Sequence, residues 1–409
     1  MRILFICQRV PYPPNKGEKI RTYNQIKFIL SCGFKVHIAC PTESIDDQKF
    51  ARQLAEHFNL KITCSKLPNK FIRYSTSILK NNPISLNFFY SAKLQTKINK
   101  LIYMQDVLIM CSSSAVAEYY FTYCRQFPDQ PAPPLIVDFM DLDSLKWQQY
   151  KQFSGPIKKI IFSREAKLLK KYEFSIQKSA LHCLFTSQVE SDLFTDKQHD
   201  FNNILKISNG IDLDYFTPMD KIDNSGNLNF IFTGVMDYFP NVDAVTWFCE
   251  VVWLDIIAKY PKATFTIVGM NPTASIKKLS QLPGVNVTGF VDDIRDYYNQ
   301  ADFFIAPLRI ARGVQNKVLE AFASNIPVIC TSNATQGINC QAETHYLLAN
   351  NNNEFKEQIF RLIEDTSLRN RLTKNSLSLV KQEYSWPAQL TPLKKVISSL
   401  VSQQITKKT

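Results

Sequence analysis

The sequence predicts an α/β protein built from two doubly wound parallel sheets, each covered by helices on both faces. Short apolar runs alternate with longer helical patterns along most of the 409 residues, which is typical of parallel strands joined by helices. A polar, proline-containing stretch near the middle interrupts this alternation, which then starts again. Because 45% of the residues are apolar, a chain of this length can form two hydrophobic cores, and we expect two domains.

The first half contains the apolar runs that we interpret as buried parallel strands, since each is short and continuous. They are residues 2–8, 34–40, 60–65, 106–112, 135–139 and 181–186. Met1–Cys7 lacks a basic leading segment and a small-residue cleavage site, so we interpret it as a first strand rather than a signal peptide.

The break in the pattern predicts a domain boundary. Ser208, Asn209 and Gly210, followed by Pro218 and a polar segment, end the first alternation. We therefore expect an N-terminal domain, a linker, a C-terminal domain and a final helix that packs back toward the N-terminal domain. These parts span residues 1–207, 208–227, 228–384 and 385–409.

The second half repeats the pattern on a smaller scale, with strand-like runs followed by helices. The runs are residues 229–234, 264–269, 285–290, 303–308 and 327–331, and the helices are residues 353–363, 367–382 and 388–405. In open α/β sheets, ligands bind at the carboxyl ends of the strands, and we expect those ends to line one cleft.

The stretch from residue 301 to residue 332 carries the clearest chemical signal. It predicts a buried strand, a loop with Gly313, a helix from about Lys317, and a second strand. Residues of a helix advance by about 100° each, so Lys317 and Glu320 share the face opposite the apolar one. Cations at a helix start oppose the helix dipole, and Arg312 and Lys317 therefore indicate a bound phosphate rather than a stabilising device.

Two further loops follow predicted strands. Residues 9–21 contain Gly17 after a proline run, and residues 232–241 contain Gly234, where the backbone can approach a ligand closely. Both loops also fit an ordinary strand exit, and the sequence leaves the two interpretations open.

Composition limits the class of protein. No apolar run is long enough to cross a membrane. The ten cysteines form no CxxC pair and show no metal-like spacing with the five histidines, so we expect free thiols in a reducing, cytoplasmic compartment and no metal site. Residues 1–204 hold 28 Lys and Arg against 17 Asp and Glu, whereas residues 205–409 hold 20 against 19. This asymmetry indicates an anionic partner for the first half.

Taken together, several stretches resemble one family. NGIDLDYF, FTGVMDYFPNVDAV, TFTIVG, GVNVTGFVDD, YYNQADFFIAPL and GVQNKVLEAFASNIPVICT are similar to segments of the retaining GT-B glycosyltransferases of family 4, the group 1 glycosyl transferases. RVPYPPNKGEKIR and VDFMDLDSLKW further resemble a branch tied to exopolysaccharide assembly and exosortase systems. The resemblance implies a GT-B fold and transfer of a sugar from a UDP- or GDP-sugar to a hydroxyl acceptor, without a metal or other cofactor.

The resemblance also implies site residues in the second half. The second glutamate of the family's E-x7-E motif, which holds the ribose, falls on Glu320, and Lys317 matches a basic residue near the phosphates. The first glutamate of that motif falls on Arg312, a departure that leaves the identity of the sugar open.

Other implied contacts are made by backbone. Val291 matches the position that reads the base, and Gly17 and Gly234 match the loops that close over the diphosphate. The loop that meets the sugar and diphosphate falls on Gly313, Val314, Gln315 and Asn316.

The acceptor side has one candidate residue. Asp141 follows the fifth strand and could orient or deprotonate an acceptor hydroxyl; equally, it could cap the helix that begins near Asp143. We count it with Lys317 and Arg312 as a catalytic candidate.

Residues 155–174 form a predicted basic helix whose isoleucines and leucines alternate with lysines. Such a helix can lie on anionic lipid, or it can be a solvated helix packed on the sheet. We therefore expect a nucleotide sugar and a glycan or lipid-linked acceptor as partners, with attachment at the inner face of the cytoplasmic membrane as a further expectation. Two other classes stay open: a GT-B-like nucleotide-sugar epimerase, and a basic nucleic-acid-binding protein, although no known nucleic-acid-binding motif accompanies the charge.

Overall fold

The computed structural model describes residues 2–79, 82–104, 106–152, 155–195, 202–218, 227–311 and 314–408. The chain divides into two compact units. The N-terminal unit consists of Met1–Ser208 with Leu390–Thr409, and the C-terminal unit is Asn209–Gln389. Each unit has its own parallel sheet and its own hydrophobic core.

The sheet of the N-terminal unit has seven parallel strands in the order β3-β2-β1-β4-β5-β6-β7. The strands are β1 (Arg2–Ile6), β2 (Val36–Thr42), β3 (Lys61–Lys66), β4 (Val107–Cys111), β5 (Leu135–Met140), β6 (His182–Phe185) and β7 (Ile204–Lys206). β1 lies inside the sheet, so the chain winds outward from it in both directions. β4 is buried along its whole length, which explains its continuous apolar sequence VLIMC.

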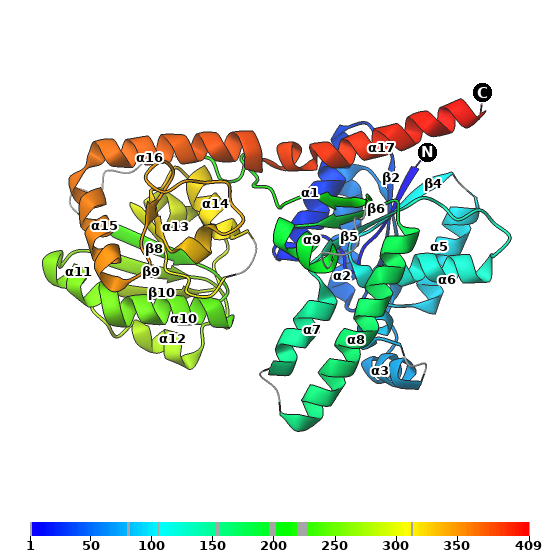
Figure 1. Cartoon of the computed structure of the whole chain (residues 1–409), viewed down its shortest axis with the longest axis horizontal. Helices are drawn as coiled ribbons and strands as arrows, with labels where there is room; N and C mark the ends of the chain where they lie inside the picture. Colours follow the sequence, from blue (N-terminus) through cyan, green and yellow to red (C-terminus); the bar gives the residue numbers. More distant parts are fainter. Residues whose placement is uncertain are drawn as a thin grey trace. The chain divides into compact units, whose positions relative to one another are not determined.

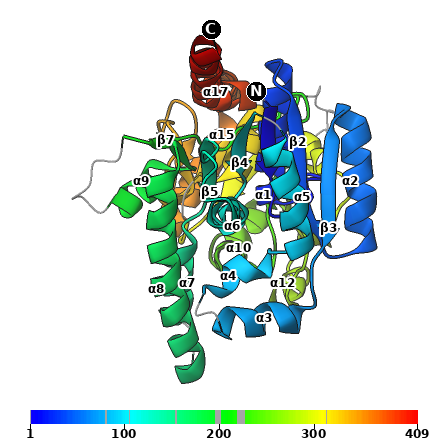
Figure 2. The same ribbon diagram turned by 90° about the vertical axis from the view of Figure 1, so that its right-hand side faces the viewer.

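Helices cover both faces of this sheet, with α1 and α2 on one side and α5 and α6 on the other (Figure 1). The helices are α1 (Gly17–Ser31), α2 (Ile45–Phe58), α3 (Lys70–Leu79), α4 (Ile84–Phe88), α5 (Ala92–Tyr103), η1 (Ser114–Ala117), α6 (Glu118–Gln126), α7 (Asp143–Gln152), α8 (Pro156–Ser179) and α9 (Gln188–Thr195). α7 and α8 form a hairpin that projects from the sheet, and α3 lies at the same end of the unit (Figure 2).

The sheet of the C-terminal unit has six parallel strands in the order β10-β9-β8-β11-β12-β13. The strands are β8 (Asn229–Thr233), β9 (Thr264–Val268), β10 (Val285–Gly289), β11 (Phe303–Ala306), β12 (Val328–Cys330) and β13 (Leu347–Leu348). The helices are α10 (Phe239–Trp247), η2 (Phe248–Trp253), α11 (Leu254–Lys259), α12 (Ala274–Leu279), α13 (Arg295–Gln300), α14 (Asn316–Ala323), η3 (Ser332–Thr335), α15 (Asn352–Glu364), α16 (Thr366–Leu379) and η4 (Val380–Tyr384).

The predicted fold class is confirmed, since both sheets are parallel and doubly wound. The runs predicted as strands correspond to β1–β6 and β8–β12. The sequence missed β7 and β13, which lie at the edges of their sheets. Both are very short, and the three residues of β7 are only partly buried or exposed, so neither has a long apolar run.

The last helix, α17 (Trp386–Lys408), belongs to both units, because its residues from Leu390 onward group with the N-terminal unit. Leu390, Leu393 and Ile397 on this part are buried. Among the helices of the described residues, none combines the length and the apolarity needed to cross a bilayer.

Candidate functional site

The carboxyl ends of β8 and β11 in the C-terminal unit bring Lys317 to the loop that follows β8. Lys317 is the second residue of α14, and its Nζ donates to Oδ1 of Asn241 at 2.6 Å. The same Nζ lies 4.2 Å from the centroid of the Phe232 ring. Nδ2 of Asn241 donates in turn to the carbonyl oxygen of Val235 at 2.9 Å, which fixes the orientation of the amide. Lys317 is therefore held in a defined position.

Burial sets the charge of Lys317. Loss of hydration lowers the pKa of the Lys317 amine to about 7, and nearby Glu320 only partly offsets this by favouring the charged form. The ammonium is thus poorly solvated by the protein alone. A bound anion would supply the missing negative charge and would raise the fraction of Lys317 that is protonated.

Glu320 lies one helical turn after Lys317 and is held by a buried chain of hydroxyl groups. Tyr298 donates to Oε2 of Glu320 at 2.8 Å, and the Thr233 hydroxyl lies 2.9 Å from the Tyr298 oxygen. Burial raises the pKa of the Glu320 carboxyl. Tyr298 binds Oε2, and no residue in the described part of the chain donates to Oε1, which can therefore accept hydrogen bonds from a ligand.

Two glycines give the site its close packing. A Cβ on Gly234 would lie 2.6 Å from Nδ2 of Asn241 and 3.0 Å from Nζ of Lys317. A Cβ on Gly269 would lie 1.6 Å from the carbonyl oxygen of Gly234. Only glycine fits at these two strand ends, because protein atoms already fill the space that a side chain would need.

The loop before α14 carries another unsatisfied group. Oδ1 of Asn316, the first residue of the helix, is buried and has no hydrogen-bond partner among the described residues. Val314 is partly buried against the core, and Gln315 is the N-cap residue of α14, although its side chain makes no capping bond. An acceptor such as Asn316 Oδ1 is costly to leave unpaired, and a ligand hydroxyl could satisfy it.

Four further residues were predicted as part of the site. Arg312 and Gly313 lie outside the described residues. Val291 is half-buried in the loop after β10, close in sequence to Asp293, which binds Arg295 and the Tyr215 hydroxyl. Gly17 begins α1 in the N-terminal unit, and a Cβ there would meet nothing within 4 Å, so packing does not require a glycine at this position.

Asp141 lies in the N-terminal unit directly after β5. Its side chain is exposed and makes no hydrogen bond within the described part of the chain. The backbone N–H groups at the start of α7 are instead bound by two glutamates from other helices: Leu142 by Glu190, and Ser144 by Glu173 at 3.0 Å. The interpretation of Asp141 as the cap of this helix is therefore wrong, and its carboxylate is available to an acceptor.

Beside Asp141, a pocket of about 310 Å³ lies between α7, α8 and α9. Leu142 and other apolar side chains line it, together with Lys151, Lys167 and Lys170. Its buried carboxylate is Glu173, whose pKa burial raises to about 7. Three lysines against one glutamate, of which only a part is ionised near neutral pH, make this pocket suited to an anionic group.

Sequence reasoning missed Tyr298 and Asn241 as site residues. The apolar spacing of Ile294, Tyr298 and Ala301 would have placed Tyr298 on the inward face of α13, but no pattern shows that its hydroxyl reaches Glu320. Asn241 was within a loop that the sequence singled out, yet its contact with Lys317 joins residues 76 positions apart.

Residues 227–365 match the family model described as Glycosyl transferases group 1. This segment is similar to the group 1 glycosyl transferases. The matched segment contains Gly234, Asn241, Tyr298, Lys317 and Glu320, so the site described above lies within the part of the chain that matches this family. The resemblance found in the sequence is confirmed for this family.

Solved structures share the fold of the whole chain. The Anabaena protein Alr3699/HepE, solved in complex with UDP and glucose, matches with a TM-score of 0.66 and 13% identity over 98% of this chain and 100% of that one. Sucrose-phosphate synthase from Thermosynechococcus elongatus matches with a TM-score of 0.65 and 14% identity over 98% of this chain and 100% of that one. The chain therefore has a GT-B fold, and the segment that matches the family lies in its second half.

One curated protein is similar along its whole length. It is a 44.6 kDa protein of the cps region of Klebsiella pneumoniae, 22% identical over 417 residues, which cover 98% of this chain and 99% of that protein. The likeness therefore extends beyond the segment that matches the family model to the N-terminal unit.

Proposed function

We propose that this protein is a retaining glycosyltransferase that moves a sugar from a nucleotide-diphospho-sugar to a hydroxyl group of a glycan or lipid-linked saccharide. The observation that carries the proposal is the poorly solvated Lys317 at a glycine-lined strand end, one helical turn from Glu320. This pair lies inside the segment that matches the group 1 glycosyl transferases.

Lys317 is proposed to bind the diphosphate of the donor. As the bond between the anomeric carbon and the phosphate oxygen breaks, negative charge develops on the leaving diphosphate. A fixed ammonium with little competing water stabilises that charge more than it stabilises the intact donor. Arg312 is proposed to add a second positive charge, so no metal ion is expected to be needed.

Glu320 is proposed to hold the ribose. Oε1 of its carboxylate can accept a hydrogen bond from the sugar diol, while Tyr298 holds Oε2 at 2.8 Å. The buried Tyr298 hydroxyl thus acts as a positioning group for Glu320. Gly234, Val291 and the backbone of Val314–Asn316 are proposed to approach the diphosphate and the base.

The acceptor is proposed to bind in the pocket of the N-terminal unit beside Asp141. The acceptor oxygen forms its bond to the anomeric carbon on the same face from which the diphosphate leaves, and its proton passes to the leaving phosphate oxygen. This route keeps the anomeric configuration and needs no second catalytic carboxylate. Asp141 is then an orienting group for the acceptor hydroxyl, and Gly17 contacts the diphosphate.

Two relatives guide the choice of substrates to test. The Anabaena protein was solved with UDP and glucose, and also with UDP-glucose. The Klebsiella relative comes from a cps region, which supports a role in exopolysaccharide or cell-surface polysaccharide synthesis. UDP-sugars are therefore the first donors to test, followed by GDP-sugars.

We expect slow hydrolysis of one class of nucleotide sugar when no acceptor is present, because water can replace the acceptor hydroxyl. Incubating the protein with individual UDP-, GDP- and ADP-sugars, with and without EDTA, and following release of the nucleoside diphosphate measures this. Proton NMR recorded early in the reaction identifies the anomer of the sugar that is released first. Release of the inverted anomer, a strict metal requirement, or epimerisation without release would each contradict the proposal.

The rate should depend on pH through Lys317. Because the pKa of its amine is about 7 in the free protein, raising the pH above 7 removes the proton that binds the diphosphate, so kcat/KM for the donor should fall by up to about tenfold per pH unit. Bound diphosphate favours the protonated amine, so the fall in kcat should come at a higher pH. The matched variant is Lys317→Arg, whose charge persists; an unchanged basic limb in that variant would assign the limb to another group.

A further inference from the structure

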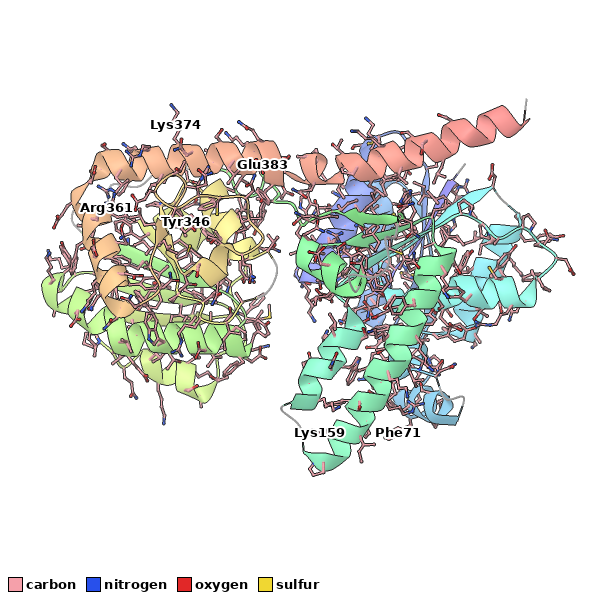
Figure 3. The ribbon with its side chains drawn as sticks, viewed as in Figure 1. Phe71, Lys159, Tyr346, Arg361, Lys374 and Glu383 are labelled. Atoms are coloured by element: carbon pink, nitrogen blue, oxygen red, sulfur yellow. The ribbon has the colours of Figure 1, made fainter. Side chains whose placement is uncertain are left out.

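An exposed apolar surface at the projecting end of the N-terminal unit has no role in the proposed reaction. It is formed by α3 and by the first turns of α8, which lie at the same end of the unit in both orientations (Figures 1 and 2). Figure 3 shows Phe71 on α3 and Lys159 on α8 at this end. We call it the tip surface. Its large apolar side chains are Phe71, Ile72, Tyr74, Ile160 and Ile161.

The helix α3 shows the reverse of the usual distribution of side chains on a surface helix. Among the side chains of α3 whose burial is described, the buried ones are polar: Arg73 is 4% exposed and binds Glu43 at 2.9 Å and the carbonyl oxygen of Phe88 at 2.5 Å, and Ser77 is fully buried. Its outer side is apolar, with Phe71 84% exposed and Ile72 beside it. In water this orientation leaves large apolar side chains hydrated, so the outer side is suited to an apolar environment.

The start of α8 has the same character. Ile160 is 73% exposed, and Ile161, Lys158 and Lys159 are exposed beside it. Farther along the helix, Leu169 is fully buried, so the exposed isoleucines lie on the first turns. The predicted basic amphipathic helix therefore holds only in part: its second half packs on the unit, and its first turns are exposed.

A buried carboxylate fixes the two helices relative to each other. Glu165 of α8 is fully buried and accepts hydrogen bonds from the backbone N–H of Ile84 at 2.9 Å and of Ser85 at 3.0 Å, at the start of α4. α4 packs against α3. The tip surface is thus a preformed surface and not two independent segments.

The positive charge around the tip surface indicates an anionic partner. Residues 57–105, which include α3, contain eight Lys and Arg and no Asp or Glu, and residues 144–164 contain five Lys and Arg and again no Asp or Glu. Lysines can lie against phosphate headgroups while neighbouring aromatic and aliphatic side chains enter the acyl region. Nucleic acid could use the lysines, but it offers no partner for the isoleucines.

We propose that the tip surface docks on a bilayer of anionic phospholipid, with Phe71, Ile72, Ile160 and Ile161 inserted at the headgroup–acyl boundary and Lys158 and Lys159 against the phosphates. The docking goes beyond the proposed transfer reaction and does not depend on it. It would bring the pocket between α7, α8 and α9 close to acceptors carried in the membrane.

Sedimentation of the full chain with vesicles tests the proposal. The wild-type protein should co-sediment with vesicles of phosphatidylcholine containing one quarter phosphatidylglycerol, several-fold less with phosphatidylcholine alone, and less as salt rises. Phe71→Ser with Ile160→Ser should lower the bound fraction at least tenfold. The matched control is Ile45→Ser, an isoleucine that is 85% exposed on α2 and should bind like the wild type.

A second set of variants tests the role of charge by changing pairs of adjacent lysines. Lys158→Glu with Lys159→Glu should abolish the preference for phosphatidylglycerol, whereas Lys277→Glu with Lys278→Glu, an exposed pair on α12, should keep it. All variants alter exposed side chains, and thermal melting checks that they fold. Equal binding to neutral and anionic vesicles, equal losses in the two lysine pairs, or an equal loss in Ile45→Ser would overturn the proposal. So would salt-sensitive binding to duplex DNA that Lys158→Glu with Lys159→Glu removes and Phe71→Ser with Ile160→Ser leaves intact.

Discussion

Replacing Lys317 with alanine is expected to lower turnover by about 10²- to 10³-fold, the loss typical of removing one preorganised group that stabilises developing charge. Nζ of Lys317 is fixed by Asn241 at 2.6 Å and lies over the Phe232 ring, so no other described side chain replaces it without rearrangement. The measurement is the steady-state release of nucleoside diphosphate from the donor that the screen identifies.

The fold should survive this change. Removal of this poorly hydrated amine takes away a group whose charged form is costly to bury. Circular dichroism and the thermal midpoint of Lys317→Ala should therefore stay close to those of the wild type. Lys277→Ala, which removes an exposed lysine of the same unit, is the matched control and should keep normal turnover. Near-normal turnover in Lys317→Ala would refute the role given to this side chain.

Replacing Gly269 with alanine is expected to destabilise the C-terminal unit by more than about 3 kcal/mol, toward the upper end of single substitutions. Two costs combine at this position. The backbone φ of Gly269 is 154°, a conformation that residues with a side chain rarely adopt, and the new Cβ would lie 1.6 Å from the carbonyl oxygen of Gly234. That oxygen belongs to the backbone at the end of β8, so it cannot move away cheaply.

A second glycine separates these two costs. Gly289 also has a positive φ, of 74°, but a Cβ there would meet nothing within 4 Å. Gly289→Ala should therefore cost only about 1–2 kcal/mol, the cost of the left-handed backbone alone. Chemical denaturation of both variants, followed by tryptophan fluorescence, measures the difference. Equal losses of stability would show that the contact with Gly234 is relieved without cost.

Both expectations concern the same few residues, because Gly234 lies between them. Its carbonyl oxygen meets Gly269, and its missing Cβ leaves room for Asn241 and Lys317. The stability of this strand end and the geometry of the proposed diphosphate site therefore depend on the same close packing. Replacing Gly234 with a small residue such as alanine should lower both the stability of the C-terminal unit and the turnover. Lys317→Ala should lower only the turnover.

Much of the fold could be predicted from the sequence because buried parallel strands are short apolar runs bounded by turn residues. β1–β6 and β8–β12 are of this kind, whereas β7 and β13 lie at sheet edges and bury too little to leave a pattern. The charged residues of α8 were harder to interpret. Glu165 and Glu173 lie among lysines, yet both are buried and bind the starts of α4 and α7.

For the proposed site, the sequence by itself determined that Lys317 and Glu320 share one face of a short helix that follows a buried strand, because helical periodicity acts within a few residues. The tertiary structure alone decided what surrounds them. Asn241 holds Lys317 from the first turn of α10, 76 residues away, Tyr298 reaches Glu320 from another helix, and burial by the assembled strand ends lowers the pKa of Lys317. These contacts join positions far apart in the chain, and no local pattern encodes which distant side chain will meet a given one once the strands have paired.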